Sequence, residues 1–369
     1  MSNYTQSTNF ATKDALSPGD PLKIVRGTEI NTEFTNIAVA VATKFDTTAL
    51  ASPGPIGATT PAAINGTTGT FSNVQMASAN GGQLAGLRNS IINGSFGIWQ
   101  RGTSFPAAAS IVYTADRWAF YRSALATGAT AAQTTPTNIV GSSSYGIRVQ
   151  RNSGNTSVDP LILAQCIETA NVRSLQGQTV TVSFKQRTSA SITAATILVT
   201  LTYGTGTDQG VNAARAGSWT GQGTLSGSFN TGSTTFTETS IQYAIPSTAT
   251  ELQLNFAYTP TGTAGANDFF DIADVQLEVG PVATPFEQRP IGMELALCQR
   301  YCFVGRLFVP TAPSTQNVPL PVSMRTTMAS ASITGTGAGF ALADVTSNSV
   351  IIATQTGGSG QTLTVSTEL

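Results

Sequence analysis

The sequence predicts a mainly β protein with an N-terminal helix, an antiparallel jelly-roll β-sandwich and a small C-terminal β domain. Three observations support this fold class. Gly supplies 36 of the 369 residues and charged side chains only 10%, a composition typical of short strands joined by turns. Segments of alternating hydrophobicity recur through the middle of the chain. The hydrophobic fraction of 40% argues against disorder for most of its length.

The N-terminal part predicts one helix preceded by a segment without a core. Residues 1–27 hold few apolar side chains, so we expect them to be loose or docked on another protein. A helix is predicted over residues 28–46, since Thr28 suits a cap and an apolar heptad seam follows. The seam consists of Ile30, Phe34, Ile37 and Val41. An isolated helix of this length is marginal in water, so we expect copies of the chain to form a homotrimer along the seam. The alternative is a helix lying on the chain's own β domain.

The rest of the chain divides into three predicted regions. Residues 47–90 are rich in Thr, Gly and Pro and predict a stalk or linker. Residues 91–288 predict the jelly-roll sandwich, because short alternating segments are separated by turn residues. Residues 289–369 predict a short helix over 292–301 and further strands, with a domain boundary at 289–292. The expected sandwich strands are 145–151, 179–187, 195–204, 239–246, 251–259 and 269–279.

Two clusters of aromatic residues open the sandwich region, "IINGSFGIWQRGTSF" at 91–105 and "YTADRWAFYR" at 113–122. Trp99 and Trp118 lie where apolar neighbours share one strand face. Trp on a strand is rarely left unburied. We therefore predict that both side chains belong to the core and not to a binding groove.

Composition excludes several functions. His is absent, which removes Ser-His-Asp and Cys-His catalysis. Cys166, Cys298 and Cys302 have no zinc-type spacing and predict buried thiols. The net charge is −1 without any basic run, so nucleic acid is not an expected partner. Apolar runs are too short for membrane insertion, and the N-terminus has no signal-peptide pattern, so we expect synthesis in a cytoplasm.

Several segments together resemble bacteriophage tail-fibre proteins. "NFATKDALSPGDPLKIVRGTEINTEFTNIAVAVATKFD" (9–46) resembles their N-terminal region, and "PIGATTPAAINGTTGTFSN" (55–73) resembles their stalk repeats. The pair "NGSFGIWQRGTSF" and "YTADRWAFY" resembles the opening of a β-sandwich module of phage tail proteins. "DVQLEVGPVATPFEQRPIGMELALCQRYC" (274–302) resembles the end of that module and the helix after it. These segments follow the family's order along the chain.

The resemblance implies a trimeric virion protein made in the host cytoplasm. It would attach to a phage tail or adaptor protein through residues 1–27 and contact the host surface with its C-terminal part. The sandwich is similar to carbohydrate-binding modules, which implies a host surface glycan as partner. A head fibre or capsid-decorating protein is the structural alternative. A tailspike-type glycan depolymerase is the enzymatic one, but the chain is short and has no evident β-helix, so we expect no enzyme.

Glycan-binding candidates lie in the polar loops: Tyr203, Asp208, Arg215 and Trp219. A sugar site combines an exposed aromatic ring with groups that hydrogen-bond hydroxyls. Trp219 stands among Gly and Ser, which favours exposure. The alternative is that Trp219 caps one end of the sandwich.

The densest acidic cluster comprises Asp268, Asp271, Asp274 and Glu278. Paired carboxylates are the groups a glycosidase uses, but Asp271 and Asp274 differ in parity on the predicted strand and should point to opposite faces. Modules that resemble this one often hold structural calcium, which implies a candidate site at Asp271 and Asp274. One strand supplies too few oxygens for Ca²⁺ alone, so we expect ordinary surface or turn positions for these carboxylates, with calcium binding as the alternative.

Overall fold

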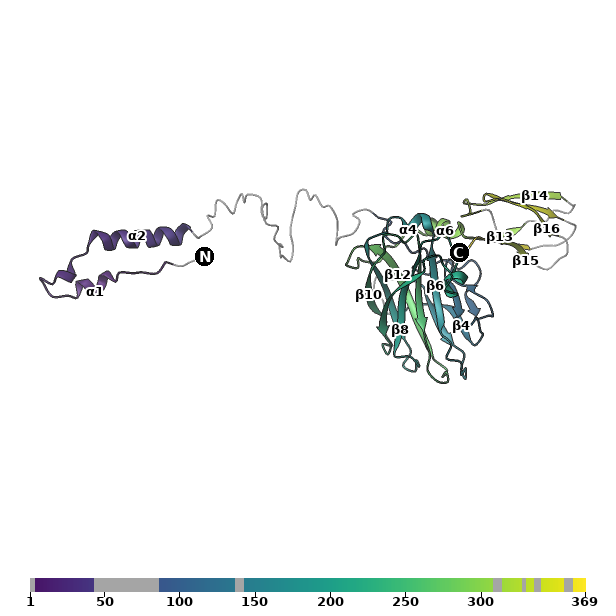
Figure 1. The fold of residues 1–369 in the computed structure, drawn as a ribbon, viewed down its shortest axis with the longest axis horizontal. Coiled ribbons are helices and arrows are strands. Elements are labelled where there is room, and N and C mark those ends of the chain that lie inside the picture. The colour runs from purple at the N-terminus through teal and green to yellow at the C-terminus, as the bar shows by residue number, and fades with distance from the viewer. Residues whose placement is uncertain are drawn as a thin grey trace. The chain divides into compact units, whose positions relative to one another are not determined.

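The computed structural model describes residues 4–42, 86–136, 143–307, 314–326, 330–334, 340–354 and 361–369. The chain divides into two units, Met1–Val74 and Gln75–Leu369 (Figure 1). Most of the predicted stalk or linker, residues 47–85, and the end of the predicted N-terminal helix, residues 43–46, lie outside the described residues. No helix in the described ranges is long and apolar enough to cross a membrane.

The N-terminal unit contains the predicted helix. It consists of α1 (Phe10–Asp14), a 3₁₀ turn η1 (Pro21–Lys23) and α2 (Gly27–Ala42). Asn9 and Asp20 cap the two short elements, because their side-chain oxygens accept the backbone N–H groups of Ala11 and Leu22 at 3.1 and 2.8 Å. The helix prediction is confirmed over residues 28–42.

Residues 4–8 lie along α2 and are fastened to it by one carboxylate. Glu33 accepts hydrogen bonds from the Ser7 N–H at 2.9 Å, from the Ser7 hydroxyl at 2.6 Å, and from the Thr8 N–H and Tyr4 hydroxyl. Lys13 forms an ion pair with Glu29 at 2.8 Å. Residues 4–8 and Lys13 of the segment expected to be loose or docked elsewhere therefore contact the helix of their own chain.

The second unit contains two six-stranded antiparallel sheets that pack as a sandwich, so the predicted fold class is confirmed. The first sheet has the order β1 (Ser104–Pro106), β4 (Ala129–Thr134), β5 (Gly146–Arg151), β12 (Phe269–Val279), β7 (Thr179–Thr188) and β10 (Thr237–Ala244). The second sheet has the order β2 (Val112–Tyr113), β3 (Ala119–Arg122), β6 (Leu161–Ile167), β11 (Glu251–Tyr258), β8 (Thr196–Gly204) and β9 (Gly223–Asn230).

The core between the sheets includes Trp118, one of the two tryptophans predicted to lie there. Trp118 is fully buried, and its ring centroid lies 4.9 Å from that of Phe96. Trp99 is half-buried against the same cluster and donates its Nε1–H to the Phe96 carbonyl at 2.6 Å. The chain passes close to β12 at Gly94, where only a residue without a side chain fits, because a Cβ there would lie 2.1 Å from the Val275 carbonyl oxygen. The core prediction is confirmed for Trp118, whereas Trp99 is half-buried against that core.

Among the described residues of the second unit, three short helices and two small sheets accompany the sandwich. The helices are α4 (Thr169–Val172), α5 (Val211–Arg215) and α6 (Ile291–Gln299), and α6 confirms the helix predicted over 292–301. The small sheets have the orders β13 (Cys302–Leu307), β18 (Gln361–Ser366), β15 (Ser330–Thr334) and β14 (Ser314–Pro319), β17 (Ser349–Thr354), β16 (Phe340–Val345).

The expected boundary at 289–292 is a packed junction. The α6 residue Cys298 shares a buried cluster with Ile98 of the sandwich. The chain returns to the sandwich at its end, where the buried carboxylate of Glu368 forms ion pairs with Arg101 and Arg117. All three cysteines are buried free thiols, as predicted, and burial raises the pKa of Cys302 to about 12.

Candidate functional site

The glycan-binding residues expected from the sequence do not form an open site. Trp219 is only 3% exposed, packs in a buried cluster with Val211 and Leu369, and donates its Nε1–H to the Gly210 carbonyl at 3.1 Å. Neither face of the ring is free for a sugar. The expectation of exposure is wrong, and the alternative that Trp219 caps the sandwich fits the structure.

The other three predicted residues make internal contacts. Asp208 accepts the N–H of Thr169, the first residue of α4, at 2.8 Å, and forms an ion pair with Arg325 at 3.2 Å. Arg215 donates to the Ser123 carbonyl at 3.1 Å and to the side chain of Asn212. Tyr203 is half-buried against the sandwich core. These residues stabilise loops, and the structure does not bring their polar atoms together around a cavity.

The acidic cluster is buried and neutralised, which corrects the expectation of surface positions. Asp271 is fully buried between Arg148 and Arg187, with nitrogen–oxygen distances of 2.8 and 2.7 Å. Asp274 forms an ion pair with Lys185 at 3.0 Å. The calcium site expected at Asp271 and Asp274 is not supported, because these carboxylates already face cationic side chains. Within the described ranges, no group of three or more His, Cys, Asp or Glu residues is arranged to hold a metal.

A β-bulge overturns the predicted parity of Asp271 and Asp274. The register of β12 against β7 shifts between Ala273 and Gln276, and Asp274 has a left-handed backbone with φ 51°. Core-facing positions change from Phe270 and Ile272 to Val275 and Leu277 across the bulge. Both carboxylates consequently lie on the outer face of the first sheet, where Arg187 and Lys185 of β7 reach them.

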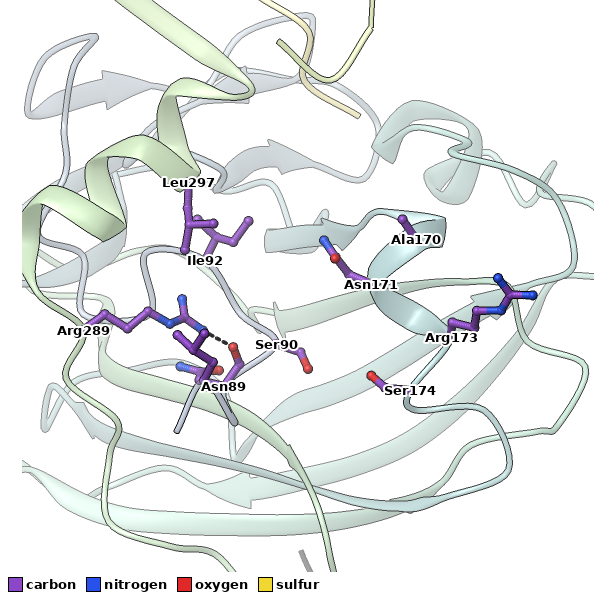
Figure 2. Close-up of a pocket in the computed structure, with 10 residues that line it drawn as sticks. Asn89, Ser90, Ile92, Ala170, Asn171, Arg173, Ser174, Arg289 and Leu297 are labelled. Atoms are coloured by element: carbon purple, nitrogen blue, oxygen red, sulfur yellow. Dashed lines mark hydrogen bonds between the residues drawn. The ribbon is translucent and has the colours of Figure 1, made fainter. Parts of the chain in front are cut away.

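A cleft of about 550 Å³ opens elsewhere on the second unit, and we call it the Arg173 cleft (Figure 2). One wall is the segment 87–92 with Arg289 and Leu297. The other is α4 with the two residues that follow it. The lining residues are Leu87, Asn89, Ser90, Ile92, Ala170, Asn171, Arg173, Ser174, Arg289 and Leu297.

The first wall is held in place by a network of buried hydrogen bonds. Arg289, whose side chain is 6% exposed, donates to the carbonyls of Asn89 and Ile91, the latter at 3.1 Å, and pairs with Glu294 at 3.3 Å. The Asn89 side chain bonds the backbone of β12 at Val275 and Leu277, at 2.9 and 3.0 Å. This wall is therefore rigid before any ligand arrives.

The second wall is fixed through the residues that flank α4. Glu168 accepts hydrogen bonds from Arg300 and from the Tyr301 hydroxyl, each at 2.7 Å. Asp208 holds the first N–H of α4, as described above, and a carboxylate is favourable at that end of a helix. Gln176 donates to the Ala249 carbonyl at 2.6 Å.

Four polar side chains of the cleft are left without partners. The side chains of Ser90, Asn171, Arg173 and Ser174 make no hydrogen bond or ion pair with any residue that the structure describes. In Figure 2, Ser90 lies on one side of the cleft, and Asn171, Arg173 and Ser174 lie on the other. Ile92 and Leu297 add an apolar surface. The cleft therefore offers amide, hydroxyl and guanidinium groups beside apolar carbon, a combination suited to a polyhydroxylated ligand.

No protein-family model matches this chain, and no curated protein matches its sequence. Two solved structures to which this chain is similar each share 14% sequence identity with it. The enzymatically active domain of tailspike protein 4 of bacteriophage CBA120 has a TM-score of 0.32, with 52% of this chain and 21% of that chain covered. A xylan-binding domain from CBM 22 has a TM-score of 0.30, with 50% of this chain and 99% of that chain covered.

A third solved structure is a family 22 carbohydrate-binding module from Clostridium thermocellum, with 16% identity, a TM-score of 0.29, and 50% of this chain and 98% of that chain covered. This chain thus spans about a fifth of the tailspike domain and nearly the whole of the two binding modules. These similarities concern the sandwich fold and extend to no ligand or activity.

Sequence reasoning missed the cleft because its residues carry no local pattern. Ser90 lies far from Asn171, Arg173 and Ser174 in sequence, and α4 has only four residues. The sequence places one acidic residue, Glu168, near Arg173, and only the structure shows that Glu168 binds Arg300 instead.

Proposed function

We propose that this chain is a homotrimeric attachment protein of the phage tail-fibre type, in which the Arg173 cleft binds host surface glycan. The observation that carries the binding proposal is the set of four unpartnered polar side chains on two rigid walls. Sugar hydroxyls donate to and accept from amides and hydroxyls, and the guanidinium of Arg173 donates to ring or carboxylate oxygens. The phage assignment rests on the sequence resemblance, and the virion is the proposed location.

Binding without cleavage is part of this proposal. Glycoside hydrolysis uses two carboxyl groups flanking the scissile bond. The residues that line the Arg173 cleft include no Asp or Glu. A depolymerase is the alternative that one observation favours, since Glu238 and Asp274 line a separate cavity of about 190 Å³. Asp274 is already engaged there by Lys185 at 3.0 Å.

Trimer formation is proposed through the apolar seam of α2. Ile30, Phe34, Ile37 and Val41 are 41%, 65%, 40% and 61% exposed, although the same helix buries Glu33 against residues 4–8. One face of α2 is therefore covered by its own chain, and the heptad face is left for other copies.

Attachment to a phage tail or adaptor protein is proposed for residues 1–27. Leu22 and Ile24 of this segment are 64% and 65% exposed, which provides an apolar contact surface. Replacing Ile24 with a charged residue should leave the trimer intact and block incorporation into particles.

A head fibre or capsid-decorating protein is the structural alternative. In that case an image of the particle would show the protein on the capsid.

The glycan proposal is tested on a printed array of bacterial surface polysaccharides. Wild-type protein should bind a subset of them, and Arg173→Ala should lower that binding at least tenfold, on the scale of a lost charged hydrogen bond. Arg215→Ala is the matched control, because among the described residues Arg215 bonds Asn212 and Ser123 and lies outside the cleft. Absence of wild-type binding, or an equal loss in the control, would contradict the assignment. Release of reducing ends would favour the depolymerase.

The seam is tested by light scattering at micromolar concentration. Phe34→Asp should give a monomer, because three charges would be buried together at the seam. Val39→Asp is the control, since Val39 is 58% exposed and lies off the heptad positions. A wild-type monomer would refute the trimer.

A further inference from the structure

A second cleft of about 420 Å³ lies beyond Arg289 and shares that residue with the Arg173 cleft. We call it the Tyr145 cleft. It is lined by Ser95, Gly97, Ser143, Ser144, Tyr145, Gln288, Arg289, Pro290 and Ile291. Tyr145 is 40% exposed and Ile291 67%, so an aromatic ring and an aliphatic side chain both face solvent here.

The backbone around Tyr145 is held by the bulge of β12. The N–H and hydroxyl of Ser143 both donate to the Oδ1 atom of Asp274, the N–H at 3.1 Å. Lys185 pairs with the other oxygen of Asp274 at 3.0 Å. On the other side of Tyr145, Gly146 begins β5 so close to β12 that a Cβ would lie 2.7 Å from the Ile272 carbonyl oxygen. The backbone on both sides of Tyr145 is therefore held in place, and the ring is exposed from a fixed position.

Apart from Ser143 and Arg289, the polar side chains that line this cleft are uncharged and make no contact with a polar group of the described residues. The side chains of Ser95, Ser144 and Gln288 and the Tyr145 hydroxyl make no hydrogen bond within the part of the chain that the structure describes. Arg289 is the charged residue of the lining, and its guanidinium is already bonded to Glu294 and to the carbonyls of Asn89 and Ile91. The available groups are an aromatic face, hydroxyls and one amide.

We propose that the Tyr145 cleft is a second sugar subsite, specific for an uncharged hexose or deoxyhexose. The apolar face of the sugar ring would lie on Tyr145, and its hydroxyls would bond Ser144 and Gln288. This inference rests on the proposed glycan-binding function and deepens it. The two clefts differ in charge, since among the described residues Arg173 is unpaired in one and no unpaired charge lines the other. One glycan with both acidic and neutral sugars fits the pair.

The experiment uses the full chain labelled with 3-fluorotyrosine, and Tyr145→Phe identifies the Tyr145 resonance. The probes are the methyl glycosides of glucose, galactose, mannose and rhamnose. We expect at least one of them to shift the Tyr145 resonance with a Kd in the millimolar range, as a single stacked ring implies. Tyr203 is the internal control, because it is half-buried against the core and its resonance should not move.

Variants separate this inference from the function on which it rests. Tyr145→Ala should weaken binding of the best array polysaccharide about five- to tenfold, whereas Tyr145→Phe should stay within about twofold because stacking is kept. If wild type binds the array but no glycoside shifts the resonance and Tyr145→Ala binds normally, the second subsite is refuted and the glycan-binding function stands. If wild type binds no polysaccharide on the array, both are refuted.

Discussion

The N-terminal unit and the sandwich distribute apolar and charged side chains in opposite ways. In α2, Phe34 is 65% exposed while the neighbouring Glu33 is 5% exposed. In the sandwich, Trp118 is fully buried, and so is the ion pair of Arg151 and Asp268, whose nitrogen–oxygen distance is 2.8 Å. Both regions bury carboxylates, but only the sandwich also buries its large apolar side chains.

This difference separates a region that completes its own core from one that does not. The sandwich has two sheets whose inner faces cover each other, so its apolar residues need no other molecule. Within residues 4–42 of the N-terminal unit, α2 is the one helix longer than five residues, and residues 4–8 contact it through polar groups around Glu33. An apolar seam left open in this way is typical of an interaction surface.

The largest expected effect is the loss of a core side chain from the sandwich. Trp118→Ala should lower the free energy of unfolding of the sandwich by about 3–5 kcal/mol, because a large cavity forms in a closed core. Phe34→Ala should leave that transition unchanged, since the side chain is exposed in the chain itself. Denaturant unfolding followed by tryptophan fluorescence measures both. Equal destabilisation by the two substitutions would remove the contrast between the regions.

A smaller effect is expected from breaking the buried ion pair. Asp268→Asn should destabilise the sandwich by about 3 kcal/mol, because Arg151 keeps its charge in a fully buried position and loses its counter-ion. Asp268 also accepts from Tyr258 and Thr193, and an amide oxygen retains part of that bonding. Glu33→Gln is the counterpart in the other region. It should abolish hydrogen-exchange protection at residues 7 and 8 without changing sandwich unfolding, and any change there would contradict the independence of the units.

The smallest effect expected is a pH response of opposite sign in the two regions. Burial raises the pKa of Asp116 to about 6 from its ordinary value of 3.8. The native sandwich thus binds this proton more tightly than the unfolded chain, and its stability should rise as pH falls from about 6 to 4, by about 2 kcal/mol. Asp116→Asn should remove that part of the pH dependence in a difference measurement by denaturant unfolding.

In the N-terminal unit, hydrogen bonds from Ser7 and Tyr4 hold the pKa of Glu33 at about 2. A depressed pKa gives stability that is present above the ordinary value of 4.5 and lost as pH falls toward 2. Exchange protection at Ser7 and Thr8 should therefore decline below pH 4.5. Protection that persists at pH 2 would show that Glu33 is not what fastens this segment.

Residue patterns along the chain were enough to predict the elements whose periodicity is local. Alternation predicted β7, β8 and β11 to within one residue at each end, and helical spacing predicted α2 and α6. It did not predict β6, "LILAQCI", because that strand does not alternate. Leu161 and Leu163 face the core, while Ala164 and Cys166 are buried on the other face in the cluster that includes α6. A strand buried on both faces loses the two-residue period by which a strand is recognised.

The tertiary structure alone decided where polar groups lie and which of them are free. Asp271 and Asp274 share a face because a bulge reverses the parity of β12, and a bulge depends on the partner strand and not on the residue pattern. Trp219 is buried because Leu369, distant in sequence, packs in the same cluster. The Arg173 cleft also depends on contacts between distant segments, since folding places Ser90 and Asn171 on opposite walls of one cleft. Local sequence fixes the period of an element, whereas a site is made by contacts between distant segments, which form only when the whole core closes.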